Sequence, residues 1–140
     1  MKKIKILIAD DHPLVAESLS LLLGSEEDFE IIGIVNNGWQ ALSFVEKYST
    51  DILLSDYNMP LLNGLELAIR LKEKKAHVRT IMLTMNEQAD HIKESIQAGV
   101  HGYVMKSAEK PELVKAIKTV YRGEKYFSEK TVKKARRNPE

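Results

Sequence analysis

Short apolar runs alternate with amphipathic stretches along most of the chain. The first, third and fourth runs are almost continuously apolar, which is typical of strands covered on both faces of a sheet. Helical patterns with short connections separate the runs, so the order of elements predicts an α/β domain with a parallel sheet. The expected strands are Ile4–Ala9, Glu30–Val35, Ile52–Asp56, Thr80–Thr84 and Gly102–Met105.

The segments between these strands carry the start and stop signals of helices. Pro13 and Pro111 stand at first-turn positions, where the missing backbone N–H is harmless. Asn63 is followed three residues later by Glu66, a pair that resembles a capping box. The expected helices are Pro13–Leu23, Gly38–Tyr48, Asn63–Lys75, Ala89–Ala98 and Pro111–Arg122.

Polar residues stand where four of the apolar runs end. Asp10–Asp11 follow the first run and Asp56 ends the third. Thr84 ends the fourth run, and Lys106 follows the fifth. Because the carboxyl ends of parallel strands meet at one edge of a sheet, these residues should lie together. Three carboxylates, a hydroxyl and an ammonium at one edge suit a divalent cation and a phosphoryl group.

The three carboxylates would repel one another unless a cation lies between them. A set of oxygen ligands without cysteine or paired histidine suits a hard ion such as Mg²⁺. Asp56 at a strand end could also act as a nucleophile toward phosphorus and form an acyl phosphate. Each residue alone has a plainer interpretation. Asp10–Asp11 could be favourable charges at the start of a helix. Thr84 could be an ordinary β-branched strand residue, and Lys106 could be a surface lysine. Their shared position at matching strand ends favours the metal and phosphoryl site.

The composition is that of one ordinary soluble domain of 140 residues, with 44% hydrophobic and 29% charged residues. The absence of cysteine excludes disulfides and cysteine-ligated metal centres. No apolar run approaches the roughly 18 residues of a membrane span. The lysines and short apolar run at the N-terminus end in aspartates, which does not match a signal peptide. We therefore expect a cytoplasmic location and no contact with a membrane.

The charge is uneven along the chain. Residues 122–140 carry seven basic and three acidic residues, whereas the remainder has a net charge of −3. The globular part is therefore not a basic nucleic-acid binder. We expect a folded domain over residues 1–123 and a basic linker or tail over residues 124–140.

Four stretches, ILIADDHPLV, LLSDYNMPLLNGLEL, TIMLT and HGYVMKSA, closely resemble the receiver domain of two-component response regulators. The resemblance covers about residues 4–122. DDHPLV and AGVHGYVMKSA resemble the NarL/FixJ branch, whose receivers precede a LuxR-type helix-turn-helix output domain. The resemblance implies a flavodoxin-like (βα)5 fold, in which five parallel strands in the order 2-1-3-4-5 form a doubly wound sheet.

The resemblance also implies roles for the strand-end residues. Asp56 would be the phosphoacceptor, taking its phosphoryl group from the phosphohistidine of a sensor histidine kinase. Asp11 and Asp56 would bind Mg²⁺ through their side chains, Asn58 through its backbone carbonyl and Asp10 mainly through water. Mn²⁺ would be able to substitute for Mg²⁺.

Lys106 would contact the phosphoryl group, and Thr84 and Tyr103 would form the switch pair that reports it. Asp56, Lys106 and Thr84 would thus carry the chemistry of phosphorylation. Such a protein is a signalling domain and not a general enzyme, because it catalyses only its own phosphoryl transfer and autodephosphorylation. The conformational switch would control a transcription-regulating output domain.

Two positions depart from the common receiver pattern. Ser107 follows the lysine where many receivers have proline, which leaves a cis peptide at Lys106–Ser107 in doubt. Met85 follows Thr84 where many receivers have a small residue. Met85, Asn58 and Asn86 should together set the rate of dephosphorylation, in a direction that the sequence does not give.

Three other functions compete with this interpretation. An aspartate-nucleophile phosphatase would need a second aspartate as general acid at the position of Asn58. A flavin- or nucleotide-binding module would need a glycine-rich loop after the first strand, where this chain has ADDHPL. A stand-alone receiver would act by protein–protein contact alone.

The resemblance and the basic segment favour a transcription regulator whose output domain, about 60 residues, lies outside this chain. DNA would then be bound only through that domain. Receivers of this branch can form homodimers through their first and last helices. We nevertheless expect the face of the first helix that bears Leu14, Ser18 and Leu21 to pack in the core.

Overall fold

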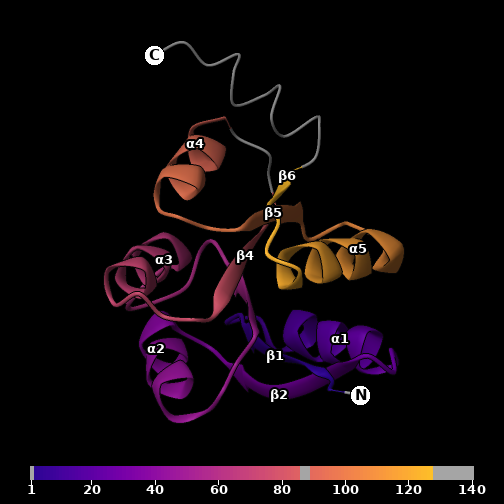
Figure 1. Ribbon diagram of the computed structural model, residues 1–140. Helices are drawn as coiled ribbons and strands as arrows, with labels where there is room; N and C mark the ends of the chain where they lie inside the picture. The colour runs from indigo at the N-terminus through magenta and orange to yellow at the C-terminus, as the bar shows by residue number, and fades with distance from the viewer. Residues whose placement is uncertain (1, 86–88, 128–140) are drawn as a thin grey trace.

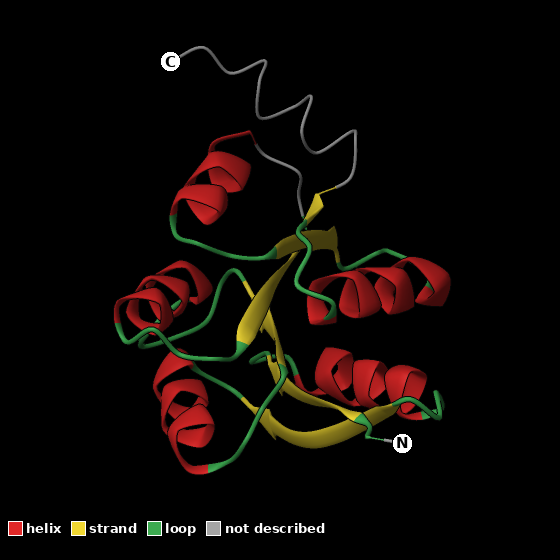
Figure 2. Cartoon of the chain, in the orientation of Figure 1, coloured by secondary structure: helices red, strands yellow, loops and turns green. Residues whose placement is uncertain are grey.

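The computed structural model describes residues 2–85 and 89–127. A parallel sheet forms the middle layer of the molecule, with helices on both of its faces (Figures 1 and 2). The strands are β1 (Ile4–Ala9), β2 (Phe29–Val35), β3 (Ile52–Asp56), β4 (Arg79–Thr84), β5 (Gly102–Met105) and β6 (Tyr126–Phe127). The helices are α1 (Pro13–Gly24), α2 (Gly38–Lys47), α3 (Gly64–Glu73), α4 (Ala89–Gln97) and α5 (Lys110–Tyr121).

The strand order is β2-β1-β3-β4-β5-β6, which confirms the predicted doubly wound sheet and its order over the first five strands. The sixth strand was not predicted. It consists of two residues, pairs parallel with β5 through Gly102 and Tyr103, and begins with a hydrogen bond from the Tyr126 N–H to the His101 carbonyl at 2.9 Å. The sheet therefore extends into the segment for which a linker was expected.

Local signals explain the helix ends. The capping box at Asn63 is formed as predicted: its side chain accepts from the Glu66 N–H at 2.8 Å, and its own N–H donates to the Glu66 carboxylate at 3.3 Å. At α2, the side chain of Asn37 accepts from the Gln40 N–H at 2.9 Å. Gly99 and Gly123 follow α4 and α5 with φ of 94° and 96°, the left-handed conformation in which glycine ends a helix at little cost.

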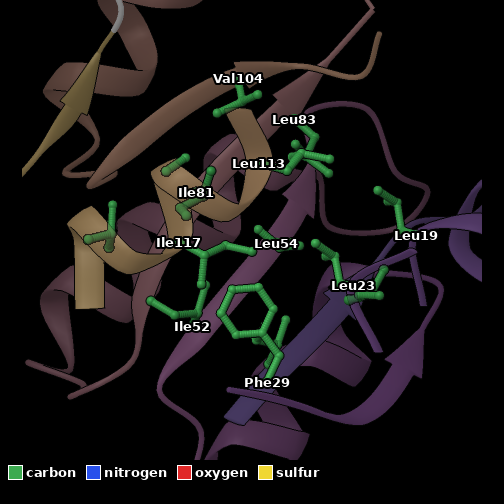
Figure 3. Packing of buried hydrophobic residues seen from close by; sticks show 14 of the residues in the cluster. Leu19, Leu23, Phe29, Ile52, Leu54, Ile81, Leu83, Val104, Leu113 and Ile117 are labelled. Carbon is green, nitrogen blue, oxygen red and sulfur yellow. The ribbon is translucent and has the colours of Figure 1, made fainter. Parts of the chain in front are cut away.

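One face of the sheet is covered by α1 and α5 and the other by α2, α3 and α4 (Figure 1). The cluster beneath α1 and α5, shown in Figure 3, is entirely apolar and joins both helices to alternate residues of the strands. Strand residues such as Ile52 and Leu54 face this cluster, whereas Leu53 faces the opposite cluster under α2 and α3. This alternation explains why the first, third and fourth runs are apolar at nearly every position.

The prediction for the face of α1 is wrong. Leu14 and Leu21 are 79% and 78% exposed, and Ser18 is exposed beside them. The buried face of the helix instead carries Ala16, Leu19 and Leu23. Because α1 has leucines on both faces, the pattern could not by itself show which leucines face the sheet.

Candidate functional site

The ends of β1 and β3 bring two buried carboxylates together. Ala9 pairs with Ser55, so Asp10 and Asp56 follow at neighbouring positions of the sheet. The two aspartates are only 2% and 3% exposed. The side chain of Asp11, the next residue along the chain, is 34% exposed. We call Asp10, Asp11, Asp56 and the residues that contact them at the carboxyl ends of the strands the acidic edge.

Lys106 neutralises part of this charge. Thr84 pairs with Met105, and Lys106 follows at the end of β5 with a side chain that is 6% exposed. Its Nζ lies 2.8 Å from Oδ2 of Asp10 and 3.2 Å from Oδ2 of Asp56. The Lys106–Ser107 peptide bond is trans. The predicted convergence of aspartates and lysine at one edge is therefore observed.

The electrostatics of Asp56 reflect burial and two neighbours of opposite sign. Burial raises the pKa of the Asp56 carboxyl above its ordinary value, because the ionised form loses water. Lys106 lowers this pKa, and the Asp10 carboxylate raises it again. The balance remains an increase, so the ionised carboxylate at the end of β3 is held at a cost in free energy.

The edge fits a divalent cation. Ligand atoms of Asp10, Asp11, His12 and Asp56 lie within 4.8 Å of one another. Among the residues that the structure describes, Lys106 supplies the ammonium that faces the buried Oδ2 atoms of Asp10 and Asp56. One lysine faces three carboxylates here, which leaves an excess of negative charge that a divalent ion would balance.

Asn58 lies at the rim of this edge. The residue is exposed, and its backbone N–H donates to Oδ1 of Asp56 at 3.3 Å. This hydrogen bond turns the β3–α3 loop around the Asp56 carboxylate. The participation of the Asn58 carbonyl in metal binding stays a prediction.

Thr84 and Tyr103 lie on the neighbouring strands β4 and β5. Both are buried, at 3% and 1% exposure. Tyr103 packs in a cluster with Tyr57, Met82 and Ile92 that lies between the sheet and α4. The roles of Thr84 and Tyr103 as a switch pair stay predictions. Met85 is 70% exposed next to Thr84, and Asn86 lies outside the described residues.

Two residues at the site were not singled out from the sequence. His12 turns its imidazole toward the acidic edge, with Nδ1 3.0 Å from Oδ1 of Asp10. Tyr57 stacks on His91 with ring centroids 4.3 Å apart, and its hydroxyl donates to Glu94 at 2.9 Å. Each directly follows a predicted site aspartate, and that adjacency was the only available signal.

The family model described as the response regulator receiver domain matches residues 6–118. The transcriptional regulatory protein DegU of Brevibacillus brevis is 33% identical over 128 residues, which cover 91% of this chain and 54% of DegU. The nitrate/nitrite response regulator protein NarL of Escherichia coli K12 is 32% identical over 124 residues, which cover 89% of this chain and 57% of NarL. The chain thus spans a little over half the length of these curated relatives.

Solved structures show the same fold. A DNA-binding response regulator of the LuxR family from Staphylococcus aureus superimposes with a TM-score of 0.80 at 26% identity, covering 84% of this chain and 98% of that one. A two-component response regulator of the LuxR family from Aurantimonas sp. SI85-9A1 gives a TM-score of 0.89 at 24% identity, with 96% of both chains covered. None of the helices in residues 2–85 and 89–127 has the length and hydrophobicity needed to cross a membrane.

Proposed function

The chain belongs to the response regulator receiver family, as a receiver domain of the NarL and LuxR type, and on that premise we propose that Asp56 is its phosphoacceptor. Members of this family serve signalling, and the phosphoryl group would come from the phosphohistidine of a sensor histidine kinase. The observation that carries the proposal is the position of Asp56. It is a buried carboxylate at the end of β3, beside Lys106 and a second carboxylate, and the loop that follows it is exposed at Asn58.

The phosphoryl transfer can be written with the groups at this edge. A carboxylate oxygen of Asp56 forms the new P–O bond, while the P–N bond of the phosphohistidine breaks and the leaving imidazole regains its electron pair. Lys106 lies close enough to pair with a phosphoryl oxygen once the Asp56 carboxylate has become an acyl phosphate. Phosphoryl transfer depends mainly on positioning and charge neutralisation, which these residues supply without a further catalytic group.

Asp10, Asp11 and Asp56, with Asn58, are the residues that we propose for binding Mg²⁺, or Mn²⁺ in its place. When bound, the ion would neutralise charge on the phosphoryl oxygens. The raised pKa of Asp56 supports this proposal, because the carboxylates are held together at a cost that a cation would offset.

For the switch, we propose that Thr84 forms a hydrogen bond to the phosphoryl group and that Tyr103 changes position when Thr84 moves. Tyr103 already lies inside the protein in this structure, so its outward position would belong to the other state. Phosphorylation need favour one of the two packings by only a few kcal/mol. The phosphorylated state would then control a transcription-regulating output domain joined to the basic segment. That output domain would be the part that contacts DNA.

The partner surface that we propose is on α1. Leu14 and Leu21 are exposed, and a groove of about 400 Å³ runs from α1 to Lys106 and Leu113. A groove that reaches from apolar residues to the acidic edge suits a kinase that must bring its phosphohistidine to Asp56. The same leucines suit a homodimer. With a kinase as partner, we expect the protein to act in the cytoplasm.

The experiment is phosphorylation with acetyl phosphate and Mg²⁺, followed by intact mass. The wild type should gain one phosphoryl group and Asp56→Asn none. Asp51→Asn is the matched control, because Asp51 lies just before the other end of β3 and accepts a hydrogen bond from the Lys5 N–H. It should be labelled like the wild type. Labelling of Asp56→Asn at the wild-type rate, or continuous turnover of a phosphomonoester, would contradict the proposal.

Lys106→Ala separates phosphate binding from metal binding. Removal of the ammonium takes away a charge that competes with the cation, so calorimetry should show Mg²⁺ binding at least as tight as in the wild type. The conformational response to phosphorylation should be lost, because the phosphoryl group has no anchor on β5. A normal response in this variant would count against the role of Lys106.

A further inference from the structure

His12 places a nitrogen atom among the carboxylates of the acidic edge. Its Nδ1 lies 3.0 Å from Oδ1 of Asp10, 3.3 Å from Oδ1 of Asp11 and 3.8 Å from Oδ2 of Asp56. The backbone of the same residue is fixed, since the His12 N–H donates to Oδ1 of Asp10 at 2.9 Å. The side chain is 61% exposed, so the imidazole covers the edge from the solvent side.

These distances match those between the ligands of one metal ion. In an octahedral site with bonds of about 2.1 Å, adjacent ligand atoms lie about 3.0 Å apart and opposite ones about 4.2 Å apart. The distances from Nδ1 to the three carboxylates lie within that range. The spacing of this nitrogen from each of the three carboxylates is therefore compatible with ligation of one ion.

Buried atoms of the same site point to a cation. Oδ2 of Asp10 and Oδ2 of Asp56 both face the ammonium of Lys106, at 2.8 Å and 3.2 Å. The aspartates themselves are 2% and 3% exposed, so solvent reaches them poorly. The single ammonium of Lys106 does not balance three carboxylates, whereas a divalent cation would.

We propose that His12 is a metal ligand and that it turns a hard carboxylate site into one that favours borderline ions such as Co²⁺. This inference rests on the proposed metal site at Asp56. Mg²⁺ gains little from an imidazole because it prefers oxygen ligands, whereas imidazole suits the later divalent ions of the transition series. The preference for Co²⁺ over Mg²⁺ should therefore depend on His12.

The chain offers clean variants for a test. His12 occupies the N-cap position of α1, but its side chain makes no capping hydrogen bond, so His12→Ala leaves the helix start intact. His77 is an exposed histidine in the loop before β4, at the opposite end of the sheet, and His77→Ala is the matched control. The proteins are studied at about pH 8, where imidazole is neutral.

Pulsed EPR of Mn²⁺-loaded protein detects nitrogen ligands directly. The wild type and His77→Ala should show the coupling of one imidazole ¹⁴N to Mn²⁺, and His12→Ala should show none. Calorimetry should find that His12→Ala weakens Co²⁺ binding about 10-fold and Mg²⁺ binding less than 2-fold.

Three outcomes overturn the inference. Absence of the nitrogen signal in the wild type, or its survival in His12→Ala, excludes direct ligation. Equal losses of Co²⁺ and Mg²⁺ affinity would show that His12 only positions Asp10. Labelling of the wild type with acetyl phosphate is scored separately, so failure of Asp56 as phosphoacceptor and failure of His12 as ligand are distinguishable.

Discussion

The two sides of the sheet are built differently around β4 and β5. Under α1 and α5, the buried cluster is wholly apolar, as the labelled side chains in Figure 3 illustrate. Under α4, the cluster contains two tyrosines and a methionine among its apolar residues. We call this second region the α4 corner; it consists of Tyr57, Ala68, Met82, Ile92, Ala98, Val100 and Tyr103, with the facing residues of α4.

Polar groups also lie inside the α4 corner. Ser95 is fully buried, and its hydroxyl has no hydrogen-bond partner among the described residues. Nδ1 of His91 is also buried without a hydrogen-bond partner among the described residues, and the ring of His91 stacks on Tyr57. Buried polar atoms without partners reduce the gain from packing. The comparison therefore indicates that the α1 and α5 side is a fixed scaffold and that the α4 corner can be repacked at a lower cost.

The largest expected effect comes from a comparison of two equally buried isoleucines. Ile117 on α5 and Ile92 on α4 are both 0% exposed. Ile117→Ala should lower the free energy of unfolding by about 4 kcal/mol, and Ile92→Ala by about 2 kcal/mol, because the α4 corner can relax into the cavity. Urea unfolding measures both. Equal losses would remove the distinction between the two regions.

The next test uses the charge at Asp56, which adjoins the α4 corner through Tyr57. Its pKa is raised in the fold, chiefly by burial, so the folded state binds the proton more tightly than the unfolded chain. Stability is therefore lost as the pH rises from the ordinary value of 3.8 through the folded pKa. Asp56→Asn should melt several degrees higher than the wild type at about pH 7.

The same argument fixes the pH dependence of this gain. The difference in melting temperature between Asp56→Asn and the wild type should shrink as the pH falls below 3.8, where the wild-type carboxyl is protonated in both states. A gain that stays constant over this range would show that the effect of the substitution is unrelated to ionisation.

A smaller effect is expected at Ser95. Ser95→Ala removes a buried hydroxyl without a described partner and introduces a better helix former in α4. The variant should be more stable by up to about 1 kcal/mol in urea unfolding. A loss of stability would mean that the hydroxyl is satisfied and that the α4 corner is better packed than we infer.

The smallest effect compares two tyrosine–glutamate hydrogen bonds. The Tyr57 hydroxyl donates to Glu94 on α4 at 2.9 Å, and that of Tyr126 donates to Glu112 on α5 at 3.2 Å. Each Tyr→Phe substitution should cost about 0.5–1 kcal/mol. Only Tyr57→Phe should speed amide hydrogen exchange in α4, because this helix has fewer apolar anchors. Faster exchange in α4 of Tyr126→Phe would contradict that assignment.

Much of the fold could be predicted because continuous apolar runs mark strands that are covered on both faces. β1, β3 and β5 have the predicted bounds, and β2 and β4 each begin one residue earlier than expected. The two residues of β6 carry no pattern of their own and join the sheet only because β5 offers a free edge. The leucines of α1 likewise predicted a helix but not which of its faces packs against the sheet.

The candidate site was also predictable only in part. The meeting of Asp10, Asp56 and Lys106 could be predicted, because strand ends in a parallel sheet share one edge. The contribution of His12 could not, since its approach depends on the direction in which one ring leaves the loop after β1. Side-chain direction in a loop is set by tertiary contacts that no local pattern encodes.

The pairing of β6 fixes the position of the last residues that the structure describes. The last long element is α5, yet the backbone returns after Gly123 and aligns with β5 through Gly102 and Tyr103. Tyr126 and Phe127 are thus paired with the strand that carries the buried Tyr103, one strand spacing of about 4.8 Å away. A rotation of β5 would therefore displace Tyr126 and Phe127 with it, and so couple the core around Tyr103 to the last described residues of the chain.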